Sequence, residues 1–173
     1  MKRAFQFTAA LIGAVLLHLI GVRLVAEWSL VLDLMLIVVV FNTLDGSTSA
    51  GMIGGLAAGW ATDALVGPVF GIFGLVDSII GYGAAYAVQR IVIQRPAEAA
   101  LFFALAVACQ QGLVLALSLL LLRDPEIPAY HWLVIKAGAT GLVGALVFYL
   151  KRRVTSQVVT WRRTRRTRIR LER

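Results

Sequence analysis

The chain has 173 residues, 60% of them hydrophobic, with a formal net charge of +8 and a mean hydropathy of +0.84. This composition leaves too little polar surface for an ordinary soluble domain, and the length has room for one compact membrane domain. The single cysteine, Cys109, excludes an internal disulfide and any metal site built from several cysteines.

Six apolar segments of near-spanning length follow one another, separated by short polar or Gly/Pro-containing stretches. The first follows Lys2 and Arg3 and is longer than the apolar core of a signal peptide, so we expect it to be a retained span. We predict an all-α integral membrane protein, a bundle of six transmembrane helices over residues 1–150, followed by a basic tail over 151–173. The predicted spans are residues 4–25, 29–44, 50–66, 69–88, 97–122 and 130–150.

The basic residues predict the orientation. Lys2 and Arg3 precede the first span, Arg90 and Arg95 lie between the fourth and fifth spans, and the tail has ten basic residues and one acid. With six spans, these three segments lie on the same side of the membrane. Since short cytoplasmic segments are enriched in Lys and Arg, we predict that both termini are cytoplasmic.

A glycine repeat marks the third predicted span. Gly51, Gly55, Gly59 and Asp63 recur every four residues, a spacing that drifts by only about 40° per step on an α-helix. The three glycines, called the glycine stripe below, leave a flat surface that another helix can approach closely in a bilayer. Two roles stay open: the stripe binds the helix of a partner, or it packs helices of this chain together.

Four ionisable residues fall inside predicted spans, where each is costly and is a functional candidate by default. They are Asp33, Asp63, Asp77 and Lys136, and the predicted topology places all of them in the outer half of the bilayer. One hypothesis is a polar cluster in which Lys136 neutralises Asp63 or Asp77. In the alternative, each carboxylate caps a helix end or reaches the membrane surface.

The sequence lacks the motifs of serine hydrolases, zinc proteases and P-loop enzymes. His18 and His131 have no neighbours at metal-ligand spacing. We therefore predict no catalytic residues, no metal and no cofactor.

The tail follows the last span directly, so we expect it to bind anionic lipid at about 1 kcal/mol per basic residue near the surface. Val154, Val158 and Trp161 are spaced for the start of an interfacial helix. Docking onto an acidic cytoplasmic protein stays open, and we do not expect nucleic acid as a partner. The basic residues proposed to contact lipid are Arg152, Arg153, Arg162, Arg163, Arg165 and Arg166.

The third and fourth spans resemble the MreD family of bacterial rod shape-determining proteins. In that family, a span of pattern small-x-x-x-Gly-Leu-x-x-Gly-x-x-x-Asp is followed by a Gly/Pro turn, a glycine and a Gly-Tyr pair. The family also tends to have Pro-Asp at the start of its second span, where this chain has Leu32-Asp33. The matching residues here are Gly51, Gly55, Leu56, Gly59, Asp63, Gly67, Pro68, Gly71, Gly81 and Tyr82.

The resemblance implies a non-catalytic subunit of the cell-elongation (rod) complex in the bacterial inner membrane. Its implied partners are MreC, which has one transmembrane helix, the actin-like MreB, and the peptidoglycan synthases that the complex regulates. It also implies a fold similar to the substrate-binding subunits of energy-coupling-factor (ECF) transporters. The alternative function is a small-molecule binder of that kind, supported by an outward-facing cluster of Asp63, Asp77 and Lys136.

Overall fold

The computed structural model describes residues 2–25, 27–44, 47–66, 69–91, 93–122 and 129–171, with side chains between residues 4 and 153 of these ranges. Every regular element in these ranges is a helix, which confirms the predicted all-α class. The helices are α1 (Lys2–Leu24), α2 (Trp28–Val31), α3 (Leu34–Thr43), α4 (Thr48–Val66), α5 (Ile72–Val88), α6 (Pro96–Leu121) and α7 (Tyr130–Leu171).

The outward faces of the long helices suit lipid. In the described part of the chain, three helical segments are long and apolar enough to cross a membrane: Ala4–Leu24, Pro96–Leu121 and Tyr130–Arg153. Shorter apolar helices cover Trp28–Thr43 and Ile72–Val88. Large side chains such as Leu16 and Leu101 are more than half exposed on α1 and α6. These long apolar helices, with large apolar side chains on their outer faces, identify a helical membrane protein. A helix suits a bilayer because it satisfies its own backbone hydrogen-bonding groups.

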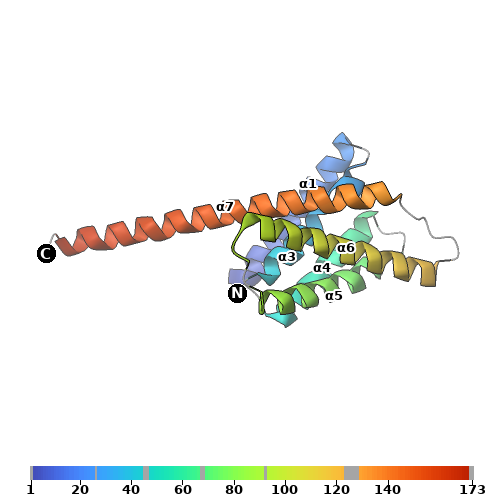
Figure 1. Cartoon of the computed structure of the whole chain (residues 1–173), viewed down its shortest axis with the longest axis horizontal. Coiled ribbons are helices and arrows are strands. Elements are labelled where there is room, and N and C mark those ends of the chain that lie inside the picture. Colours follow the sequence, from blue (N-terminus) through green and yellow to red (C-terminus); the bar gives the residue numbers. More distant parts are fainter. Residues whose placement is uncertain are drawn as a thin grey trace.

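α3 lies inside the bundle and contacts α1, α4, α5, α6 and α7. Its residues Leu36 and Val40 are fully buried and share one core with Val76 of α5 and Phe103 of α6. α4 pairs with α5, and α6 lies beside α7 (Figure 1). The core therefore forms around a short central helix, with two helix pairs beside it.

The second predicted span is two helices rather than one, which corrects the prediction of a continuous helix over 29–44. α2 ends at Val31, and Leu32 is extended, with φ −137° and ψ 132°. Asp33 then caps α3, because its Oδ1 accepts a hydrogen bond of 3.0 Å from the backbone N–H of Leu36. The N–H of Asp33 donates to Thr140 Oγ1 at 3.1 Å. Protein groups thus satisfy the backbone where the helix breaks, as a break within a bilayer requires.

α7 continues without interruption past residue 150, where the last span was predicted to end. Its 42 residues correspond to about 60 Å of helix, and its C-terminal part extends beyond the bundle (Figure 1). The backbone of the basic segment is therefore a direct extension of the last membrane helix. Where α7 leaves the bundle, Arg152 donates a hydrogen bond to the carbonyl oxygen of Gln94, which precedes α6. The side chains beyond residue 153, including Arg162, Arg163, Arg165 and Arg166, lie outside the described residues.

Candidate functional site

The glycine stripe of α4 faces α5 of the same chain. A methyl group added to any of its three glycines would overlap a backbone carbonyl oxygen of α5. Going along α4 from Gly51 to Gly55 to Gly59, these oxygens belong to Gly81, Asp77 and Phe73. The two helix backbones are thus in direct contact, which only glycine permits. Of the two roles left open by the sequence, the stripe serves the packing of this chain's own helices.

The Gly-Tyr pair of α5 divides its two residues between the two faces of the helix. Gly81 is buried, and a methyl group on it would overlap the carbonyl oxygen of Gly51. Tyr82 points the other way and is 49% exposed, with its ring stacked on that of Tyr86. Gly81 therefore completes the α4–α5 contact, while Tyr82 is available on the outer surface of the pair.

Asp63, the last residue of the repeat, caps the neighbouring helix. Its Oδ2 accepts hydrogen bonds from the backbone N–H groups of Gly71 and Gly74, both at 2.9 Å, and its Oδ1 accepts one from Phe73 at 3.0 Å. These are donors at the start of α5 with no partner inside that helix. A carboxylate is also favoured there by the helix dipole. Asp63 therefore stabilises the α4–α5 pair, and it is not the ion-pair partner of Lys136.

Gly71 makes this cap feasible. Its φ is +107°, a conformation that residues with a side chain rarely adopt. The turn at Gly71 brings the backbone donors of Gly71, Phe73 and Gly74 within reach of one carboxylate. The adjoining motif residues Gly67 and Pro68 lie outside the described residues.

We expect Asp63→Asn to destabilise the protein by about 2–3 kcal/mol, because hydrogen bonds to charged groups contribute about 1.5–3 kcal/mol each. Asparagine offers one acceptor oxygen, and its NH₂ group would face a backbone donor. The effect is measured as the midpoint of thermal unfolding in detergent, with size-exclusion chromatography as the readout of the folded fraction. Glu27→Gln changes an exposed carboxylate in the same way and serves as control. Equal midpoints for the two variants would contradict the capping role.

Lys136 pairs with Asp33, which corrects the predicted cluster of Lys136 with Asp63 or Asp77. Lys136 Nζ lies 3.1 Å from Asp33 Oδ2, and both side chains are largely buried. The helix break at Leu32 is the physical reason, since it places Asp33 inside the bundle opposite α7. Asp33 both caps α3 and neutralises Lys136, so Asp33, rather than Asp63 or Asp77, is the carboxylate that pairs with the buried lysine.

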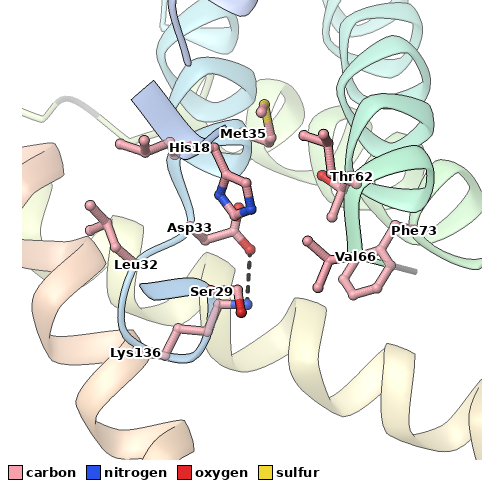
Figure 2. Close-up of a pocket in the computed structure, with 11 residues that line it drawn as sticks. His18, Ser29, Leu32, Asp33, Met35, Thr62, Val66, Phe73 and Lys136 are labelled. Carbon is pink, nitrogen blue, oxygen red and sulfur yellow. Dashed lines mark ion pairs between the residues drawn. The ribbon is translucent and has the colours of Figure 1, made fainter. Parts of the chain in front are cut away.

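A cavity of about 40 Å³ adjoins this ion pair. Figure 2 shows the His18 ring and the Asp33–Lys136 pair on one side of the cavity, with Thr62 and Phe73 on the other. His18 is buried, and its Nε2 has no hydrogen-bond partner among the described residues. The volume suits a few water molecules, because one water needs about 10–15 Å³ by this kind of measure. The lining contributes polar groups that such water can bridge.

Asp77 has a different partner from the one predicted. Gln110 of α6 donates a hydrogen bond from Nε2 to Asp77 Oδ1 at 2.7 Å, and both side chains have no exposed surface. Sequence reasoning missed Gln110, although an uncharged polar residue in the most apolar predicted span was a signal. It also missed Thr140, which accepts a hydrogen bond from the backbone of Asp33. In the described part of the chain, no group of three or more acidic, histidine or cysteine side chains could hold a metal ion.

A comparison with protein-family models matches residues 1–135 to the rod shape-determining protein MreD. The chain belongs to the MreD family. The matched segment contains all of α4 and α5, and so the glycine stripe, Asp63, Gly71 and Tyr82. MreD proteins are a shape-determining family, and the geometry shows what most of the motif residues do in this chain. No curated protein and no solved structure matches the chain.

Proposed function

We propose that this MreD-family chain is a non-catalytic, multi-pass subunit of the rod complex in the bacterial inner membrane, with both termini in the cytoplasm. In this role it binds MreC, works with MreB and the peptidoglycan synthases of the complex, and helps to regulate peptidoglycan synthesis and cell shape. The family match over residues 1–135 carries the proposal. The basic α7 extension supports the orientation, since it suits the anionic cytoplasmic lipid surface.

Because α5 occupies the glycine stripe, the MreC helix in this proposal binds another surface of the chain. We place its transmembrane helix on the outer face of α5, defined as Ile79, Tyr82, Gly83 and Tyr86. All four residues are exposed in the chain alone. A methyl group on Gly83 would meet nothing within 4 Å, which leaves a shallow flat site between larger side chains. A second helix can pack its backbone closely at such a position.

The rigid α4–α5 pair supports this placement. Backbone contact at three glycines and the three hydrogen bonds to Asp63 fix α5 from behind. A binding surface held in one conformation loses little entropy when a partner docks. The motif of the family therefore has two parts in this proposal: the inward residues hold α5, and Tyr82 contacts the partner.

A leucine at position 83 tests the site. We expect Gly83→Leu to fold normally, because the added side chain meets only open space, and to lose most of the MreC that co-purifies with the wild type. Gly112→Leu on α6 is the matched control, since Gly112 is also exposed and also has nothing within 4 Å. Retention of MreC by Gly83→Leu, or its loss in Gly112→Leu alone, would place the MreC helix on another face.

The small-molecule alternative gains no support from the cavity beside Asp33. Sites for drug-sized ligands occupy about 300–1,000 Å³, whereas this cavity has a volume of about 40 Å³. Asp63 and Asp77, which were to line an outward pocket, are instead buried in contacts with α5 and α6. The shape-determining role is therefore the function we propose.

A further inference from the structure

Two fully buried polar side chains meet between α5 and α6 and leave one oxygen each without a partner. Gln110 Nε2 donates to Asp77 Oδ1 at 2.7 Å. Among the described residues, Asp77 Oδ2 and Gln110 Oε1 have no hydrogen-bond partner. Buried polar atoms in native proteins are nearly always paired. Two vacant oxygens on the same pair of side chains therefore require an explanation.

An ionised Asp77 cannot satisfy them. A carboxylate only accepts hydrogen bonds, and so does an amide oxygen, so no hydrogen bond can form between the two vacant oxygens. They belong to the same carboxyl and amide groups that already share the bond from Gln110 Nε2 to Asp77 Oδ1. A protonated carboxyl group, in contrast, has one donor as well as an acceptor. One proton on Oδ2 allows a second hydrogen bond and satisfies both oxygens.

We propose that Asp77 and Gln110 form a proton-binding site, in which Asp77 carries a proton on Oδ2 and donates it to Gln110 Oε1. The two side chains then form a ring of two hydrogen bonds that joins α5 to α6. The site lies within the bundle and its test does not depend on whether MreC binds the outer face of α5.

The surroundings of Asp77 favour the neutral carboxyl. The other carboxylates buried in the described part of the bundle are Asp33 at the start of α3 and Asp63 of α4, and Lys136 of α7 is largely buried as well. Lys136 is already paired with Asp33 at 3.1 Å. Two carboxylates and one ammonium group oppose a third negative charge.

The neighbouring side chains add no solvation for a charge. Val76 precedes Asp77 on α5, and Val107 lies one turn before Gln110 on α6. Both are fully buried members of one apolar core. A bare carboxylate in such a place is poorly solvated, and a buried acid generally takes up a proton instead.

Infrared spectroscopy of the purified full chain in nanodiscs tests the proposal. We expect the wild type at neutral pH to show a carbonyl stretching band of a protonated carboxylic acid, which shifts when aspartate is labelled with ¹³C. Asp77→Asn should lose this band and keep the wild-type thermal midpoint, because an amide preserves both hydrogen bonds. Glu27→Gln, which changes an exposed carboxylate, is the control and should keep both the band and the wild-type midpoint.

Gln110→Met provides a second readout if Asp77→Asn does not fold. It removes the amide but not the acid, so the band should move to the higher wavenumber of a carboxyl with a weaker hydrogen bond. A wild-type spectrum without the band would overturn the proposal. A band that is unchanged in both Asp77→Asn and Gln110→Met belongs to another carboxyl group and would overturn it equally.

Discussion

Gly55→Leu is expected to prevent α4 and α5 from packing and to leave a protein that inserts but does not fold stably. A methyl group at Gly55 already overlaps the carbonyl oxygen of Asp77 and approaches the Cα atom of Ser78 to 2.9 Å. Both are backbone atoms, which cannot move aside as a flexible side chain can. Overpacking a core costs about 1–3 kcal/mol when side chains can adjust, and we expect a larger cost here.

The midpoint of thermal unfolding in detergent and the monodispersity on size-exclusion chromatography measure this effect. Gly112→Leu adds the same side chain to an exposed position of α6 with no atom within 4 Å and should be near the wild type. We also expect Gly55→Leu to lose MreC. In that variant the displaced α5 no longer presents the proposed MreC-binding face, whereas position 55 itself does not contact MreC. If Gly55→Leu keeps the wild-type midpoint and only MreC is lost, the glycine stripe would be the partner surface after all.

The second large effect is expected at the buried ion pair. Lys136→Met leaves Asp33 as an unpaired carboxylate, which should cost about 3–5 kcal/mol, the usual effect of removing one partner of a buried pair. Asp33 is 6% exposed and keeps its hydrogen bond from Leu36, which does not replace the lost positive charge. The thermal midpoint should therefore fall well below that of the wild type.

The double variant Asp33→Asn with Lys136→Met separates charge from packing. Asparagine retains an oxygen that can cap α3, and methionine fills much of the volume of lysine without its charge. We expect most of the lost stability to return, since replacing a whole buried pair is often nearly neutral. If the double variant is as unstable as the sum of the two single variants, the pair interaction is not the source of the effect.

Part of this fold could be predicted from local patterns. Long apolar runs between polar breaks predicted where most helices lie, because a helix in lipid must be apolar over about 20 residues. The four-residue glycine period predicted a close-packing face on α4. Whether this face meets the next helix of the chain or the helix of a partner could not be decided, because the contact depends on the turn that Gly71 makes at φ +107°.

The polar contacts were harder to predict for a related reason. Asp33 is close to the start of a predicted span, where a carboxylate usually reaches water or caps a helix end. The extended conformation of Leu32 breaks the helix inside the bundle and places Asp33 opposite Lys136. No local sequence pattern indicated this helix break. Gln110 was missed because it pairs with Asp77 across 33 positions of the sequence. Spacing along one helix gives no information about such a contact.

An experimental structure of the chain bound to MreC would test the account most directly. We expect α5 still to lie on Gly51, Gly55 and Gly59, with Asp63 hydrogen-bonded to the first backbone amides of α5. We expect the MreC helix to cover Tyr82 and Gly83. A structure in which the MreC helix lies on the three glycines, with α5 displaced from them, would contradict it.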